Sequence, residues 1–281
     1  MASARDIRRR IKSVKNIQQI TKAMKMVAAA RLRRAQERAS ASRPYTEKIQ
    51  EVLANVVANA RDVAHPLLAA RDVNCVGYLI VGADKGLAGA YTSNLMKEAV
   101  PQIYGRDNAY IITVGRKPRD YFRRRHYNVI GEYTGFSEKP TYDHAVEIAA
   151  DVARRFAAGE LDEVYLIYTK FFSPINQKPT TIKLLPIDSD GHQPSQTEYI
   201  FEPSAPDVLS QLLPKYLETL IYGALLQSAA SELGARMTAM GSATDNAQDL
   251  ISKLILNYNK VRQATITREI SEIVGGAEAL K

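Results

Sequence analysis

The sequence of 281 residues contains a single cysteine, Cys75, and this scarcity excludes two kinds of site. One thiol cannot form a disulfide within the chain, and it cannot supply a metal site built from several thiolates. The four histidines lie far apart in the sequence and none stands at a metal-ligand spacing, so we expect no metal site. Cys75 is expected to be a small buried residue at the start of a strand.

Long apolar runs are also missing from the sequence. No stretch reaches the roughly eighteen consecutive apolar residues that a membrane-spanning helix needs. The N-terminus shows no apolar signal core. We therefore expect a soluble chain that is not exported by a signal peptide.

Glycine and proline, the residues that interrupt helices, are absent from long parts of the chain. Neither occurs in the first 43 residues, which predicts one long helix over residues 3–43 that resumes after Pro44 to about residue 60. No proline follows Pro214. A second long helix is predicted over residues 208–273.

Apolar side chains recur along both predicted helices in steps of three and four, which is typical of a coiled-coil seam. The N-terminal stripe consists of Ile7, Ile11, Val14, Ile17, Thr21, Met24, Ala28, Leu32 and Ala35. The C-terminal stripe consists of Met237, Met240, Thr244, Ala247, Ile251, Leu254, Tyr258, Val261 and Thr265. An isolated helix of this length needs a packing partner. We predict that the two ends of the chain form a long antiparallel coiled coil.

Between these helices the pattern changes to short runs rich in valine, isoleucine and tyrosine. The runs are residues 75–83, 109–115, 127–134 and 163–172, and helix-like segments at 90–104, 117–126 and 141–158 separate them. Strand alternating with helix predicts a largely parallel, three-layer α/β domain of the Rossmann-like kind. Residues 180–187 and 197–202 are further candidates for edge strands, and residues 188–196 for an exposed loop. The predicted domains are residues 1–60 and 206–281 for the coiled coil and 73–203 for the α/β domain.

Acidic residues are scarce in the N-terminal segment, which concentrates the positive charge of the chain. The net charge is +8, and residues 1–43 hold thirteen lysines and arginines against only Asp6 and Glu37. Residues 215–281 hold seven charges of each sign. A segment this basic indicates an anionic partner, which could be nucleic acid, a membrane surface or an acidic protein.

The three partners make different demands on a basic helix. Nucleic-acid readers with long basic helices usually fork from a dimer zipper into a groove, whereas here the seam continues through the basic segment. Membrane-surface helices need bulky apolar and aromatic residues, and residues 1–43 contain no aromatic residue. An enclosing acidic protein is favoured, and a basic coiled-coil nucleic-acid-binding protein remains the alternative.

The glycine-rich stretch "VGADKGLAGAYTSN", residues 81–94, is the strongest candidate for a nucleotide site. Its spacing of Gly82, Gly86 and Gly89 matches neither the dinucleotide fingerprint nor the P-loop. We interpret it as a tight turn between a strand and a helix, and we expect no cofactor. Nothing else in the sequence points to an active site.

Three long motifs then resemble one family. They are "ASARDIRRRIKSVKNIQQITKAMKMVAAARLRRAQ" at the start, "GYLIVGADKGLAGAYTSN" in the middle, and "ATDNAQDLISKLILNYNKVRQATITREISEIVGGAEAL" at the end. All three closely resemble the gamma subunit of F-type ATP synthases. The resemblance covers the whole chain and agrees with the two long helices and the α/β domain.

The resemblance implies a non-catalytic rotor shaft inside a ring of three catalytic (beta) and three noncatalytic (alpha) subunits. The α/β domain would lie at the base, beside the epsilon subunit, on the membrane ring of c subunits. Proton flow would turn the ring and the shaft, and so drive ATP synthesis in the catalytic subunits. The chain would bind no nucleic acid, meet the membrane only through the complex, and act on the cytoplasmic side of a bacterial cell membrane.

The resemblance also assigns roles to residues of this chain. Met24 and Lys25 match the coupling contact with acidic loops of the catalytic subunits. Arg262 and Gln263 match the pair that hydrogen-bonds a catch loop on a catalytic subunit. The terminal residues 271–281 match a tip that is seated in an apolar bearing.

Two further expectations combine the resemblance with the residues themselves. Consecutive helix positions lie about 100° apart, so at least one of Arg9 and Arg10 must point away from the seam. We expect Arg9 or Arg10 to form a salt bridge with an acidic loop of a catalytic subunit in one rotary state. With Cys75 as the only cysteine, the two-cysteine redox switch of chloroplast relatives is not expected.

Overall fold

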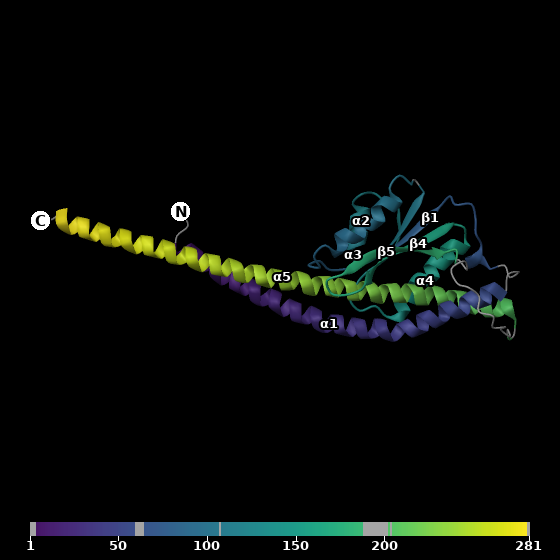
Figure 1. Ribbon diagram of the computed structural model, residues 1–281. Helices are drawn as coiled ribbons and strands as arrows, with labels where there is room; N and C mark the ends of the chain where they lie inside the picture. The colour runs from purple at the N-terminus through teal and green to yellow at the C-terminus, as the bar shows by residue number, and fades with distance from the viewer. Residues whose placement is uncertain (1–3, 60–64, 107, 188–201, 203, 280–281) are drawn as a thin grey trace. The chain divides into compact units, whose positions relative to one another are not determined.

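A computed structural model describes residues 4–59, 65–106, 108–187, 202 and 204–279. Two very long helices stand at the ends of the described chain, with an α/β domain between them in sequence (Figure 1). The elements in chain order are α1 (Ala4–Asn59), a 3₁₀ turn (Pro66–Leu68), β1 (Val76–Val81), α2 (Tyr91–Ile103), β2 (Ala109–Val114), α3 (Arg116–Arg123), β3 (Val129–Tyr133), α4 (Tyr142–Ala157), β4 (Glu163–Phe171), β5 (Gln177–Leu185) and α5 (Ala205–Ala279).

The chain divides into two compact units, and each long helix contributes to both. The helix-pair unit contains the start of α1, to Val27, and the end of α5, from Met237. The α/β unit is Ala28–Arg236. The division into domains 1–60, 73–203 and 206–281 stays a prediction.

The sheet has five strands in the order β3-β2-β1-β4-β5. The first four strands are parallel and β5 pairs antiparallel with β4. The central strand β1 is buried along its whole length, as expected for an apolar run covered on both faces. The edge strand β5 contains Pro179 and Lys178, residues that natural edge strands tolerate. The predicted α/β fold with a largely parallel sheet and long terminal helices is confirmed.

Helices cover both faces of this sheet. On one face α2 and α3 pack over β1, β2 and β4, with Leu95, Ile103 and Phe122 buried between them. On the other face α4 packs beside the part of α5 that belongs to this unit, around Ile148, Phe156 and other apolar residues. The core therefore has three layers, and α5 is an integral part of one of them.

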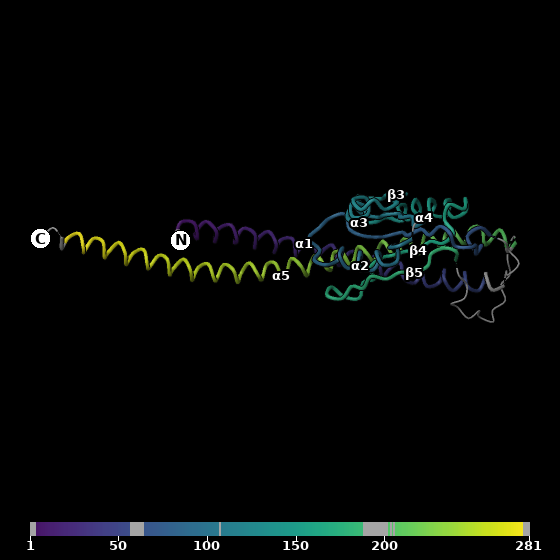
Figure 2. The backbone as a smooth tube through the Cα atoms, turned by 90° about the horizontal axis from the view of Figure 1, so that it is seen from above, coloured from purple at the N-terminus to yellow at the C-terminus, as the bar shows by residue number. Residues whose placement is uncertain are grey.

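The predicted C-terminal stripe is confirmed in the helix-pair unit, because each of its nine residues is buried or half-buried. The N-terminal stripe contained one error. Ile17 is 50% exposed, and Gln18 takes the inward position and donates a hydrogen bond to Gln248 at 2.7 Å. The regular alternation of four and three residues from Ile7 leads to Gln18 and not to Ile17, and this position in the repeat decides which side chain faces the partner helix. Figure 2 shows the start of α1 and the end of α5 running side by side in opposite directions.

The predicted interruption at Pro44 was wrong, because α1 runs through this residue without a break. A proline inside a helix removes one hydrogen bond and costs about 3 kcal/mol. Buried side chains on both sides of Pro44, such as Leu32 and Leu53, offset this cost by packing in the α/β unit. The candidate strand at 197–202 and the loop at 188–196 lie outside the described residues, apart from Glu202.

Candidate partner-binding surfaces

Asp84 follows β1 at the carboxyl end of the sheet, where open α/β sheets usually bind ligands. The residue is 8% exposed. Its carboxylate accepts hydrogen bonds from the backbone N–H groups of Gly135 at 2.9 Å, Ser137 at 3.0 Å and Arg116 at 3.1 Å. Burial alone would raise the pKa of Asp84, but these backbone donors reverse that effect and hold the pKa below its usual value. The loop that contains Asp84 is therefore tied to its neighbours by the chain's own groups.

Glycine is required where this loop meets the next one. Gly115 has φ +99°, and a Cβ atom there would lie 2.7 Å from the carbonyl oxygen of Gly82. The two loops consequently approach each other more closely than a residue with a side chain at position 115 would permit. The glycine-rich stretch 81–94 serves this packing, in agreement with its interpretation as a strand-to-helix turn.

Helix α5 lies against the same end of the sheet. The Tyr91 hydroxyl, in the first turn of α2, donates to the Ser228 carbonyl at 3.4 Å, and burial raises the pKa of Tyr91 above its usual value. Ser231 donates from its hydroxyl to the Thr169 carbonyl at 3.0 Å. The chain's own helix thus occupies the position where a doubly wound sheet would hold a ligand.

A buried ion pair joins α5 to this loop. Arg236 contacts the Glu232 carboxylate at 2.6 Å and the Glu138 carboxylate at 3.1 Å. It also donates two hydrogen bonds to the Gly86 carbonyl, at 3.2 and 3.3 Å. Glu232 is 1% exposed, and its burial raises its pKa while the Arg236 guanidinium opposes that rise. Sequence reasoning missed this pair, although the four-residue spacing of opposite charges in an apolar stretch of helix signals it.

Two further cations reach Glu138 from other elements. Arg31 of α1 pairs with this carboxylate, and Lys85 of the loop after β1 lies 3.4 Å from it. We call these five residues, Arg31, Lys85, Glu138, Glu232 and Arg236, the Arg236 cluster. The cluster connects α1, α5 and two loops at the carboxyl end of the sheet.

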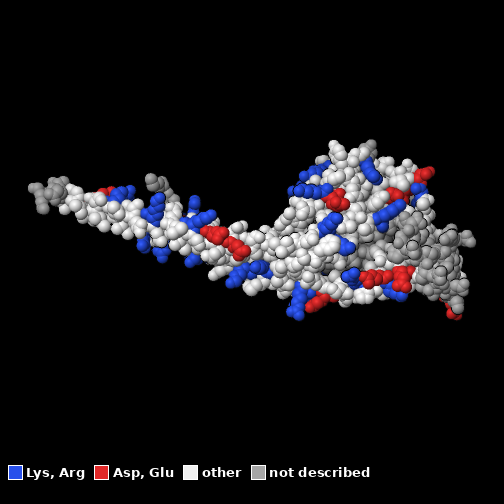
Figure 3. All heavy atoms as spheres, in the orientation of Figure 1, with Lys and Arg blue, Asp and Glu red and all other residues white. Residues whose placement is uncertain are grey.

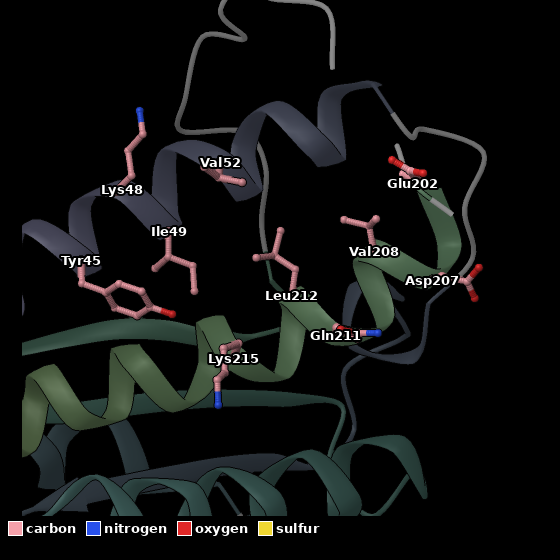
Figure 4. Close-up of a pocket in the computed structure, with 10 residues that line it drawn as sticks. All are labelled: Tyr45, Lys48, Ile49, Val52, Glu202, Asp207, Val208, Gln211, Leu212 and Lys215. Carbon is pink, nitrogen blue, oxygen red and sulfur yellow. The ribbon is translucent and has the colours of Figure 1, made fainter. Parts of the chain in front are cut away.

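An apolar groove lies between α1 and α5 within the α/β unit (Figure 4). Its volume is about 510 Å³. Ile49 and Leu212 point into the space between the helices, whereas Lys48 points away from α5.

The helix-pair unit carries the basic residues of the chain start on its surface. All eight lysines and arginines of residues 4–27 are exposed, and Figure 3 shows basic side chains along the face of this unit that it displays. Arg9 and Arg10 are among them. Within the described residues neither guanidinium has an acidic partner.

Met24 and Lys25 lie farther along α1, about 22 Å from Arg9 at ~1.5 Å per residue. Met24 is half-buried and Lys25 is exposed. The Lys25 side chain runs beside Gly241, where a Cβ atom would lie 3.5 Å from its Cε and Nζ. The absence of a side chain at Gly241 gives Lys25 a path across the partner helix.

Arg262 and Gln263 are both exposed near the end of α5. Beyond them every described side chain from residue 266 to 277 is exposed, including the large apolar residues Ile270 and Ile273. The structure therefore places the six predicted contact residues on one unit but in three separate pairs along its length.

Among the described residues, no three histidines, cysteines or carboxylates are grouped so that they could hold a metal ion. The described helices also include none that is both long and apolar enough to cross a bilayer. Cys75 is half-buried rather than buried and its thiol is free. Its backbone N–H donates to the Asp162 carboxylate at 2.8 Å, which fixes the start of β1.

Comparisons with known proteins agree with one another. A family model described as ATP synthase matches residues 3–280. The chain is 55% identical over 282 residues to the ATP synthase gamma chain of Desulfitobacterium hafniense and 52% identical over 292 residues to that of Heliobacterium modesticaldum, with 100% of both chains covered in each case. Its fold is similar to a chain of the Euglena gracilis mitochondrial ATP synthase, with a TM-score of 0.71 and 19% identity over 99% of this chain and 94% of that one. None of these relatives is described as a nucleic-acid-binding protein, and that alternative has no support.

Proposed function

Because the chain belongs to the family of ATP synthase gamma chains, it is a central-stalk subunit of that enzyme, and we propose that its helix-pair unit is the shaft of the rotor. The observation that carries this proposal is the 55% identity to a bacterial gamma chain over the full length of both proteins. The shaft would couple proton-driven rotation of the membrane ring to ATP synthesis or hydrolysis in the catalytic subunits. The chain itself would contribute no catalytic residue.

The surface of the helix-pair unit supports an enclosed position between acidic protein surfaces. Arg9 and Arg10 are exposed and have no acidic partner among the described residues, and one of them would pair with a carboxylate on an acidic loop of a catalytic subunit in one rotary state. Met24 and Lys25 would touch the acidic coupling loops of the catalytic subunits. The half-buried position of Met24 leaves part of its side chain free for such a contact.

The end of α5 would turn within the ring. Arg262 and Gln263 would hydrogen-bond a loop of one catalytic subunit, since both are exposed. The exposed apolar side chains of the last described turns, including Ile270, Ile273 and Val274, would be covered by an apolar bearing. An uncovered row of this kind is otherwise costly in water.

The α/β unit would form the base of the stalk, in contact with the epsilon subunit and the ring of c subunits. The complex would be held at the cytoplasmic side of a bacterial cell membrane, and this chain would meet the membrane only through its partners. The bacterial source of the most similar relatives reported above supports this location. The three-part division into residues 1–60, 73–203 and 206–281 would then assign both long helices to the coiled coil, although residues 28–59 and 206–236 also pack in the base.

Reconstitution tests the proposal directly. The full chain is mixed with alpha and beta subunits of a bacterial relative, and a bead is fixed to the α/β unit. We expect one copy of this chain for every three catalytic subunits, and rotation of the bead when ATP is supplied. A complex that hydrolyses ATP at the full rate while the bead stays still would contradict the rotor function.

A further inference from the structure

Helices α2 and α3 enclose a second groove on the face of the sheet opposite α4 and α5. Its volume is about 450 Å³. The residues that line it are Thr92, Ser93, Met96, Lys97, Val100, Pro101 and Tyr121. Its walls are therefore mostly apolar, and the groove can hold apolar side chains of a partner.

Basic residues surround this groove without acidic partners. Lys117 and Arg125 stand one turn before and one turn after Tyr121, the residue of α3 that lines the groove. Arg125 lies just beyond the end of the helix with its guanidinium over the Tyr121 ring, and the Lys117 side chain extends toward Gly86. Lys97 stands on the opposite rim, on α2, and Arg124 lies beside Arg125. The four cations Lys97, Lys117, Arg124 and Arg125 are exposed, and none has an acidic partner within the described residues. We call them the groove cations.

The three arginines within α3 behave differently. Arg116 lies 3.6 Å from the Asp84 carboxylate, Arg119 lies 2.8 Å from that of Asp120, and Arg123 pairs with Glu132. The chain thus neutralises the basic residues on one side of α3 with its own acids. The cations around the groove have no acidic partner among the described residues. Figure 3 shows blue side chains over the α2 and α3 region.

We propose that the α2–α3 groove is a docking site for an acidic amphipathic segment of a protein partner. Apolar side chains of that segment would enter the groove, and its carboxylates would pair with the groove cations on both rims. This proposal goes beyond the shaft function and does not depend on it, because every residue involved belongs to the α/β unit.

The groove fits a protein segment better than a nucleic acid or a lipid surface. Single-stranded nucleic acids bind by stacking bases on exposed aromatic faces. The only aromatic ring among the lining residues, Tyr121, has the Arg125 guanidinium over its face at 3.7 Å. A membrane contact uses apolar side chains that protrude into the bilayer, whereas Met96 is 5% exposed and lies inside the unit.

Photo-crosslinking in whole cells tests the proposal with the full chain. A benzophenone amino acid replaces Ser93, which is exposed on the groove wall, and in a control strain it replaces Asn94, which is exposed on the same helix but does not line the groove. The crosslinked segment is identified by mass spectrometry. We expect a protein segment with at least two carboxylates beside apolar residues, captured from Ser93 and not from Asn94.

The charge argument is tested in the same strains. The double variant Lys117→Gln/Arg124→Gln should lower the crosslinking yield about threefold or more at low salt. Lys139→Gln/Lys178→Gln removes two exposed lysines of other elements and should leave the yield unchanged. A lipid or nucleic-acid adduct, a captured segment without carboxylates, no capture above the Asn94 level, or equal losses in both double variants would each overturn the proposal.

Discussion

Replacing Arg236 by glutamine removes the cation that compensates a deeply buried carboxylate. Glu232 is 1% exposed and would be left without a counter-ion, while Glu138 would keep Arg31 and Lys85. Breaking a buried ion pair by removing one partner costs about 3–5 kcal/mol. We therefore expect the free energy of unfolding to fall by about this amount at neutral pH.

The loss should depend on pH, and its sign follows from Glu232. Burial already raises the pKa of this carboxyl above its usual value of 4.5, and Arg236 opposes the rise. Without Arg236 the pKa rises further. A carboxyl with a raised folded-state pKa favours the folded state below its unfolded pKa, and this stability is lost as the pH rises through the folded pKa. The difference between wild type and variant should therefore be smallest near pH 4.5 and grow with pH, by about 1.4 kcal/mol for each added pKa unit.

Urea unfolding of the full chain at pH 5, 7 and 8, followed by circular dichroism, measures this effect. Arg31→Gln is the matched control, because Arg31 contacts the same cluster through Glu138 but its side chain is 50% exposed. The control should cost at most about 1 kcal/mol. A loss in the Arg236 variant that is the same at all three pH values, or no larger than in the control, would refute the reasoning.

Three further predictions use other parts of the chain. Ile251→Ala should lower the free energy of unfolding by about 2–5 kcal/mol, whereas Ile255→Ala, at a residue 41% exposed, should lower it far less. Equal urea midpoints for the two variants would contradict the placement of Ile251 in the seam. Cys75→Ser should leave ATP hydrolysis by the reconstituted complex, and its response to reductant, unaltered, and a reductant effect that disappears in the variant would contradict a structural role. Replacing both Arg9 and Arg10 by glutamine should raise the rate of ATP hydrolysis about two- to fivefold by removing ion pairs of ~0.4–1 kcal/mol. Rates that are unchanged at both low and high salt would show that neither arginine forms such an ion pair.

The elements of the fold were predictable wherever the pattern is local. The four parallel strands and the three helices between them were predicted within a few residues, because each apolar run or periodic stretch reports its own burial. The continuation of α1 through Pro44 was not predictable, since the packing of Leu32 and Leu53 outweighs the local preference of proline. At Ile17 an apolar side chain misled the seam prediction, because the position in the repeat, and not the hydrophobicity, decides which residue faces the partner helix.

The long-range hydrogen bonds and ion pairs that stabilise the α/β unit could not be predicted from the sequence. Asp84 receives its donors from residues about 30 to 50 positions later, and Arg236 reaches a loop 150 residues earlier. Such pairings appear only when the sheet has brought the loops to one edge. The six contact residues predicted from the family resemblance stay predictions, because their partners belong to other proteins.

The polar contacts within the helix pair oppose sliding of α1 along α5. Thr21 and Thr244 join their hydroxyls at 2.9 Å, next to the Gln18–Gln248 contact. Each hydroxyl also donates to a carbonyl of its own helix, Thr21 to Gln18 and Thr244 to Met240. A shift of the two helices by one seven-residue repeat would leave Thr21 facing Met237 or Ile251 and would lose the hydrogen bond between the two hydroxyls, which contributes about 0.5–1.5 kcal/mol. A purely apolar seam would impose no such penalty, because one repeat resembles the next. The polar contacts thus fix the register of the two helices, which keeps the length of the shaft constant while it is twisted.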